Sequence, residues 1–282
     1  MSLKLIKQNN LMKKNILIYK DIDGLSSEYV TKKIIDLTKK KCGGQNYYVE
    51  IGTFRGFTSI NNSLNNKNVK CITIDNFKFD KKNQIKFRKS VKKYSVKNLK
   101  LINCDYEKAF EILKKKKIKI GLLFVDGPHD YRAQYVILEK FKTLLSKNAC
   151  IIIDDANYNH VKLATLDFLN NNRDFKLISQ KYSKFHPADQ RLNKKKSTNW
   201  NGIHIIEKNT NKNPVKLKIN KNLALKFHID SHDIQRHYFG NRVLDVLDNL
   251  FYFFKSGDKK YLNQKLKIIF NENKKRTFKS NF

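Results

Sequence analysis

Carboxylates and one histidine follow two apolar runs of this chain in an order suited to proton transfer or metal binding. Asp126 ends one run and His129 comes three residues later, while Asp154 and Asp155 end the next run. An imidazole exchanges protons near neutral pH and can act as a general base. Carboxylates at adjacent strand ends are suitable ligands for a hard cation such as Mg²⁺ or Ca²⁺. We therefore take His129 and Asp126 as candidate catalytic residues, and Asp126, Asp154 and Asp155 as a candidate metal site.

A glycine turn earlier in the chain has the pattern of a cofactor-binding element. The run 47–51 is apolar apart from Glu50, and Gly52 and Gly56 follow it four positions apart. Glycine tolerates positive φ and has no Cβ, so such a turn lets the backbone approach a ligand closely. A helix expected from residue 57 would direct its free amides toward the turn. Strand, glycine turn and helix in this order open a nucleotide-binding α/β domain.

The spacing of the glycines restricts the nucleotide. A dinucleotide fingerprint requires G-x-G-x-x-G, in which the middle glycine admits a pyrophosphate. Phe54 occupies that middle position here, and no further glycine follows Gly56 in the turn. This argues against a pyrophosphate ligand and makes a nicotinamide oxidoreductase the least favoured class.

The elements that must position these residues form an alternating series. Five apolar runs have a carboxylate at or near their ends and are separated by segments of helical length, which is typical of strands covered on both faces of a parallel sheet. Ligands of such sheets bind at the carboxyl ends of the strands. We expect a Rossmann-like α/β fold with seven strands, mostly parallel with the last antiparallel, and helices on both faces. The expected strands are 47–51, 70–75, 99–105, 118–126, 149–155, 175–179 and 202–207, and the expected helices are 57–65, 80–96, 106–117, 130–146 and 159–171.

Two motifs in this order resemble one enzyme family. The E-x-G-x-x-x-G pattern from Glu50 is similar to motif I of class I methyltransferases that use S-adenosylmethionine. The run Asp126-Gly127-Pro128-His129-Asp130-Tyr131 resembles the D-G-x-H-x-Y signature of a small-molecule O-methyltransferase group, methyltransferase family 24-like and related to catechol O-methyltransferase. The resemblance covers residues 46–208.

The resemblance implies roles for individual residues. Asp75 would hold the ribose hydroxyls of S-adenosylmethionine, and Asp105 with Tyr106 would lie near the adenine. Asp105 alone would also suit a helix N-cap. A divalent cation, Mg²⁺ or another, would fix and acidify a substrate hydroxyl. The residues expected at the amino-acid end of the cofactor are Glu50, Gly52, Thr53, Phe54 and Gly56.

The resemblance implies methyl transfer from S-adenosylmethionine to a hydroxyl of a small molecule, a sugar or a secondary metabolite. An RNA or protein methyltransferase is the second hypothesis, motivated by a net charge of +34 from 59 basic and 25 acidic residues. The lysines are spread through every segment, which is typical of an AT-biased coding sequence, so nucleic acid is not favoured as a partner. The cluster Lys194 to Lys196 lies in a connection that could border the site. A non-catalytic α/β binding module remains the third hypothesis.

Composition and hydropathy describe the rest of the chain. The four cysteines are scattered, which predicts reduced thiols; with no secretory pattern or membrane-length apolar run, we expect a cytoplasmic protein without a membrane partner. We expect an N-terminal helical extension over 1–45, a core over 46–208 and a C-terminal helical extension over 209–282. In the last, Val243, Leu247, Leu250 and Phe254 recur at helical spacing and predict an amphipathic helix, which packs on its own domain or forms a homodimer contact.

Overall fold

The computed structural model describes residues 16–182 and 202–208, together with part of the region from 246 to 266. The chain divides into two compact units, residues 1–220 and 221–282. The division into 1–45, 46–208 and 209–282 stays a prediction. The connection that contains Lys194 to Lys196 lies outside the described residues.

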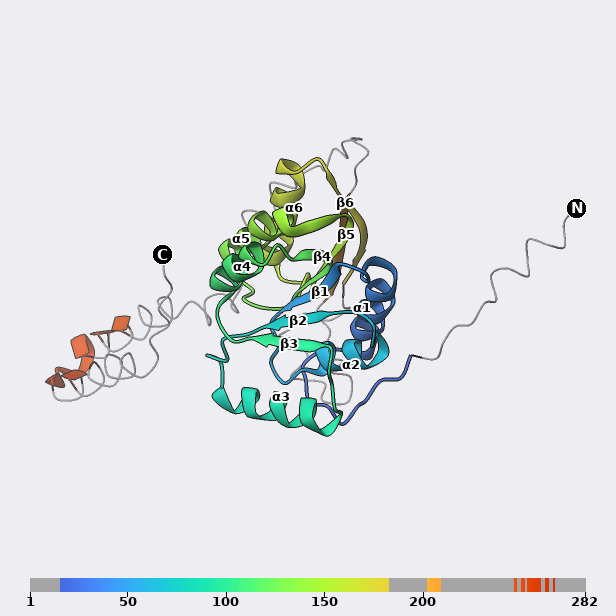
Figure 1. Ribbon diagram of the computed structural model, residues 1–282. Helices are drawn as coiled ribbons and strands as arrows, with labels where there is room; N and C mark the ends of the chain where they lie inside the picture. Colours follow the sequence, from blue (N-terminus) through green and yellow to red (C-terminus); the bar gives the residue numbers. More distant parts are fainter. Residues whose placement is uncertain are drawn as a thin grey trace, which may run out of the picture. The chain divides into compact units, whose positions relative to one another are not determined.

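The first unit is built on one seven-stranded sheet (Figure 1). Its order is β3-β2-β1-β4-β5-β7-β6, in which β7 runs antiparallel to both of its neighbours and the pairs among β1 to β5 are parallel. The expected mostly parallel sheet with an antiparallel last strand is therefore confirmed. The strands are β1 Asn46–Ile51, β2 Cys71–Ile74, β3 Leu99–Ile102, β4 Lys119–Val125, β5 Leu145–Ile153, β6 Phe175–Lys181 and β7 Ile203–Lys208.

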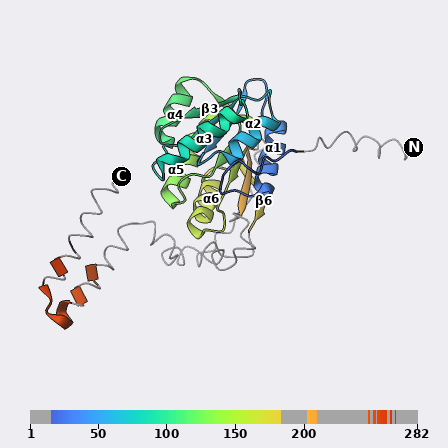
Figure 2. The ribbon, with the colours of Figure 1, turned by 90° about the horizontal axis from the view of Figure 1, so that it is seen from below.

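Helices cover both faces of this sheet, as Figures 1 and 2 show. One face carries α1, α2 and α3, whereas α4, α5 and α6 pack on the other. Most of them begin at a side chain that caps the free amides, as Asp80, Asp105 and Asp130 do. The helices are α1 Glu28–Lys41, α2 Phe57–Asn65, α3 Lys81–Lys93, α4 Tyr106–Lys115, α5 Tyr131–Phe141 and α6 Asn159–Asn171.

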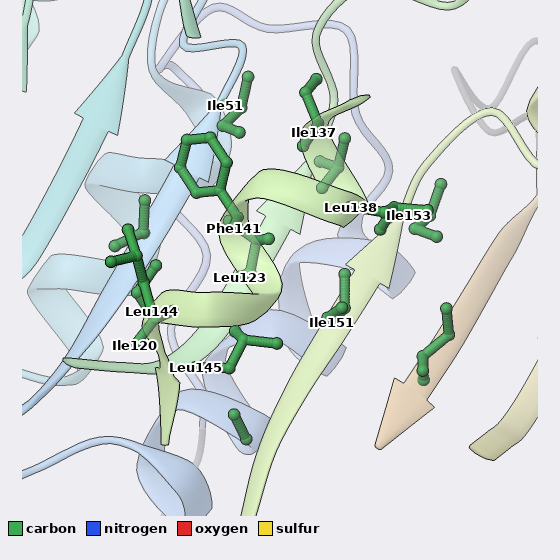
Figure 3. Packing of buried hydrophobic residues seen from close by; sticks show 14 of the residues in the cluster. Ile51, Ile120, Leu123, Ile137, Leu138, Phe141, Leu144, Leu145, Ile151 and Ile153 are labelled. Carbon is green, nitrogen blue, oxygen red and sulfur yellow. The ribbon is translucent and has the colours of Figure 1, made fainter. Parts of the chain in front are cut away.

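The central strands are buried on both sides. In β4, Leu123 and Val125 face the α4–α6 side, whereas Leu122 and Phe124 face α1. Figure 3 shows the first cluster, to which Phe141 of α5 and the sheet residues Ile51 and Leu123 all belong. Continuous apolar runs in these strands follow from this two-sided burial.

The boundary between α5 and β5 differs from the expected one. The sequence predicts a helix to residue 146 and a strand from Ala149, but α5 ends at Phe141 and β5 begins at Leu145. A short 3₁₀ turn, Lys142–Leu144, joins them. Leu145 is buried and pairs with Ile120 of β4, so tertiary burial extends the strand through a polar stretch. This part of the prediction was wrong.

The segment before the sheet is packed into the first unit. Val30 and Ile34 of α1 are fully buried against residues of β1, β4 and β5. Upstream, the Tyr19 amide donates to Oδ1 of Asn61 at 2.7 Å, and Ile22 is buried against α2 and α3. Residues 16–25 therefore run along α2 and α3 and contribute to their burial.

The second unit is described only in part. Several residues between 246 and 263 are helical, in agreement with the expected helix, whereas Val243 lies outside the described residues. Leu247, Phe251 and Phe254 of this helix are exposed. All four cysteines of the chain are free. No described helix combines the length and apolarity that crossing a bilayer requires.

Candidate active site

Three strand ends lie side by side at the carboxyl edge of the sheet. The Gly52 amide donates to the carbonyl of Ile74 at 2.9 Å, and the Asp126 amide donates to the carbonyl of Ile51 at 2.8 Å. The Asp154 amide donates to the carbonyl of Val125 at 2.9 Å. These bonds continue the parallel ladder one residue past β1, β4 and β5. The candidate residues after each strand are thereby brought into one row, as expected from the sequence.

The glycines of the turn have a conformational and a packing role. Gly52 has φ +96°, and a Cβ there would lie 1.8 Å from the carbonyl oxygen of Asp126. Gly56 has φ +93°, and its Cβ would lie 2.6 Å from the Phe87 ring. Both conformations favour glycine. The two glycines therefore let the end of β1 approach the end of β4 and let α2 pack on α3.

Asp75 fastens this turn. Its Oδ2 accepts the backbone amides of Thr53 at 3.0 Å and of Phe54 at 2.8 Å, and its Oδ1 accepts the amide of Phe77 at 2.7 Å. Phe54 has a φ of +48°, which is unfavourable for a bulky residue and is held by these bonds. A carboxylate offers about four acceptor positions, so one remains for a further donor.

Glu50 lies inside the protein. Its side chain is fully buried and accepts hydrogen bonds from the hydroxyls of Thr58, at 2.9 Å, and Tyr48. Burial raises its pKa to about 8, despite these hydrogen bonds. Because Thr58 belongs to the first turn of α2, Glu50 ties β1 to the helix that follows the glycine turn.

His129 lies between two carboxylates. Its Nε2 is 2.6 Å from Oδ2 of Asp155 and 3.7 Å from Oδ1 of Asp126. Burial, the largest cause, and the nearby Asp155 together raise the pKa of Asp126 to about 6, although His129 acts in the opposite direction. On the other side, the ring of Tyr158 stacks on the imidazole with centroids 6.3 Å apart. The loop after β4 and the turn after β5 thus hold one imidazole in a mostly buried, negatively charged place.

Asp154 is affected by the charges of Asp126, His129 and Asp155, but its hydrogen bonding is different. It is buried, and in the described part of the chain its Oδ1 has no hydrogen-bond partner. Burial raises its pKa well above the usual range, and the charges of Asp126 and Asp155 act in the same direction. Donor atoms of Asp126, His129 and Asp155 lie within 4.8 Å of one another, a set that does not include Asp154. The possible metal ligands in the structure are therefore Asp126, Asp155 and His129, whereas the sequence predicts Asp154 as the third ligand.

Asp105 and Tyr106 lie at the start of α4. Oδ1 of Asp105 accepts the Lys108 amide at 2.9 Å, so this residue is the N-cap. Asp105 is exposed and Tyr106 is half-buried. The capping role that the sequence suggested is present, and the carboxylate remains open to solvent.

Sequence reasoning missed Arg55. Its guanidinium stacks on the Phe54 ring at 4.7 Å, its Nε donates to Oδ1 of Asn83 at 2.9 Å, and its Nη1 pairs with Asp23 at 3.4 Å. The glycine turn is thereby tied to α3 and to residues 16–25. The adjacency of Phe54 and Arg55 is the one signal in the sequence, because Asp23 and Asn83 are distant along the chain.

Comparisons with known proteins agree with the fold described above. A family model described as a methyltransferase domain matches residues 49–156, from β1 to the turn after β5. An O-methyltransferase from Bacillus cereus in complex with SAH has 14% identity and a TM-score of 0.50, with 73% of this chain and 87% of that chain covered. Cofactor-bound Rv0187 from MTB has 14% identity and a TM-score of 0.51, with 74% and 88% covered.

Two further comparisons show how little of other known proteins this chain matches. The chain spans 48% of the length of a methyltransferase-like protein from Streptococcus mutans, with 64% of this chain covered, 11% identity and a TM-score of 0.48. None of the curated proteins matches the chain. At these identities the solved structures establish the fold alone. Residues 49–156 therefore match the model of a methyltransferase domain, and the first unit has the seven-stranded Rossmann-like fold of the solved methyltransferases.

Proposed function

We propose that the protein transfers a methyl group from S-adenosylmethionine to a hydroxyl of a small molecule, a sugar or a secondary metabolite. The observation that carries the proposal is the position of His129 between Asp126 and Asp155 at the carboxyl edge of the sheet, next to the glycine turn. A general base beside a cofactor-binding turn is what O-methylation of a weakly acidic hydroxyl requires.

The residues around the glycine turn fit the cofactor. The turn from Gly52 to Gly56 and the free amides at the start of α2 would hold its amino-acid end, and the remaining acceptor position of Asp75 suits a ribose hydroxyl. Tyr106, with the exposed Asp105, would border the adenine. When bound, S-adenosylmethionine supplies an activated methyl group on a sulfonium. The SAH found in the Bacillus cereus enzyme supports this choice of cofactor.

His129 would take the proton from the acceptor hydroxyl. Asp155, 2.6 Å from Nε2, orients the imidazole and stabilises the positive charge that it gains. Asp126 adds a second negative charge at 3.7 Å. The stacked Tyr158 restricts the plane of the ring. This set of residues would activate the acceptor and leave the attacking oxygen aligned for an in-line displacement.

We further propose that a divalent cation binds here through Asp126 and Asp155. Burial, and secondly the charges of neighbouring carboxylates, raise the pKa values of Asp126 and Asp154, so a cation that neutralised this group would be stabilising. Either His129 or Asp154 completes the site. Titration with Mn²⁺, followed by electron paramagnetic resonance, distinguishes the two possible third ligands. If Asp154→Asn loses Mn²⁺ binding, Asp154 is the ligand. Loss in His129→Ala instead makes the imidazole a ligand and contradicts its role as base.

The test of the proposed function is methyl transfer to a panel of hydroxylated small molecules, detected by mass spectrometry. We expect a methylated product with the wild type and a loss of about 10²- to 10⁴-fold in rate with His129→Ala, the usual contribution of a general base. SAH binding, measured by calorimetry, should be unchanged in this variant and shows that the fold is intact. Methylation confined to RNA or protein substrates would favour the second hypothesis, and absence of cofactor binding would favour a non-catalytic binding module.

A further inference from the structure

A second polar group lies at the same edge of the sheet and takes no part in the site described above. Lys162 is in the first turns of α6, Tyr182 follows β6, and His204 is in β7. His204 pairs with Ile153, the last residue of β5, in the antiparallel register. It therefore lies beside the strand end that leads into Asp154. We call Lys162, Tyr182 and His204 the Lys162 group.

The three side chains contact one another. The Tyr182 hydroxyl and Nε2 of His204 are 2.8 Å apart, and Nζ of Lys162 lies 4.6 Å from the centroid of the Tyr182 ring. His204 is only 1% exposed, and within the described part of the chain its Nδ1 has no hydrogen-bond partner. The group is thus a polar cluster built from α6, the end of β6 and the start of β7.

The start of β7 is packed closely against the turn after β5. The carbonyl of Gly202 accepts the Ala156 amide at 3.2 Å, and a Cβ on Gly202 would lie 2.3 Å from Oδ1 of Asn157. Because this turn also contains Asp155, the residues just before β7 pack directly against a segment of the candidate active site.

Among the described residues, the Lys162 group has a positive charge and no negatively charged member. Lys162 is half-buried, and no carboxylate of the described residues lies within ion-pair distance of it. Burial lowers the pKa of Lys162. Burial, and secondly the charge of Lys162, lower the pKa of His204 to about 4, so this imidazole is neutral at neutral pH. A partly desolvated ammonium next to neutral hydrogen-bonding groups is stabilised when an anion binds to it.

α6 connects this group to His129. Tyr158, whose ring stacks on His129, accepts the Lys162 amide at its carbonyl at 3.0 Å, so the two residues are one helical turn apart. Residues four apart lie on the same face of a helix. Lys162 therefore lies on the same face of α6 as Tyr158, the residue whose ring stacks on the proposed base.

We infer that Lys162, with the hydroxyl of Tyr182, binds an anionic group of the methyl acceptor, a carboxylate or a phosphate, while the acceptor hydroxyl lies at His129. This inference rests on the proposed function and deepens it, because it assigns the acceptor to the class of small hydroxylated anions. The ammonium supplies a charge-assisted hydrogen bond, and the Tyr182 hydroxyl supplies a neutral one.

The experiment compares acceptor pairs that differ only in the anionic group. One pair is 3,4-dihydroxybenzoate and catechol, for a carboxylate, and the other is glucose 6-phosphate and glucose, for a phosphate. Affinities for the full chain saturated with SAH are measured by NMR titration. The variants are Lys162→Met and Tyr182→Phe. The control is Lys147→Met, which removes the same charge from an exposed position near the beginning of β5.

We expect the wild type and Lys147→Met to bind the charged member of one pair roughly tenfold more tightly than the neutral member, the value of one charge-assisted hydrogen bond. Lys162→Met should remove this preference, and Tyr182→Phe should reduce it. The pair that shows the preference identifies the anion. Equal affinities within both pairs, or the same loss in Lys147→Met as in Lys162→Met, would overturn the inference. SAH binding separates the two proposals, because its absence in the wild type would instead refute the proposed function.

Discussion

Replacing Glu50 by Gln should make the protein more stable at neutral pH. Glu50 is fully buried and its pKa is raised from 4.5 to about 8 by burial. The folded protein therefore keeps a proton on this carboxyl that the unfolded chain releases above pH 4.5. Stability conferred by that proton is complete below pH 4.5 and is lost as the pH rises to about 8. A Gln amide stays neutral and can still bond to Tyr48 and Thr58, so it does not undergo this loss.

The size of the gain in stability follows from the difference between the pKa of Glu50 in the unfolded chain, 4.5, and in the folded protein, about 8. Each pH unit between the two pKa values changes the free energy of unfolding by about 1.4 kcal/mol. From pH 4.5 to pH 7, the Glu50→Gln variant should gain about 3 kcal/mol relative to the wild type. The gain should level off above pH 8.

Urea unfolding at a series of pH values from 4.5 to 8.5 measures this gain. The control is Glu111→Gln, which removes an exposed carboxyl from α4. The relevant quantity is the difference in free energy of unfolding between wild type and variant at each pH. If that difference for Glu50→Gln is the same at pH 5 and pH 8, Glu50 is not held protonated, and the argument from its burial is refuted.

Two further predictions concern the support of the site. Gly52→Ala should destabilise the fold by at least about 3 kcal/mol, because it combines a positive φ with a Cβ 1.8 Å from a carbonyl oxygen, whereas Gly44→Ala, with a φ of +57° and open space, should cost about 1 kcal/mol. Equal losses in urea unfolding would contradict the packing role of Gly52. Ile34→Ala, which empties a fully buried position of α1, should cost about 2–5 kcal/mol, and the exposed Lys33→Ala should change stability little. Thermal unfolding of both variants tests whether α1 belongs to the cooperative unit.

Much of the fold could be predicted because local and tertiary preferences agree. The helices 57–65 and 159–171 have the predicted bounds, and each predicted strand has a counterpart in the sheet. The predicted and observed elements differ where a polar stretch belongs to a strand, as in the residues just before Ala149. The periodicity of the sequence does not reveal that Leu145 pairs with Ile120. Lysines and serines are compatible with a helix, so the sequence pattern predicts one there.

The candidate site was predictable to the extent that parallel strands end at one edge. That rule brings Gly52, Asp126 and Asp154 together. It does not give side-chain partners, so it missed that Asp75 binds the turn amides and that His129 pairs with Asp155. The Lys162 group could not be predicted, because its three members meet only through the register of an antiparallel strand.

Calorimetric titration of SAH into the wild type tests whether the glycine turn binds the cofactor. We predict micromolar binding that Asp75→Ala abolishes, because this carboxylate both holds the glycine turn through two backbone amides and faces the ribose in the proposed complex. The control, Asp80→Ala, also removes a carboxylate that accepts a backbone amide, that of Lys82 at 2.9 Å, and should bind SAH like the wild type. No binding by the wild type, or equal losses in the two variants, would show that this turn does not bind the cofactor through Asp75.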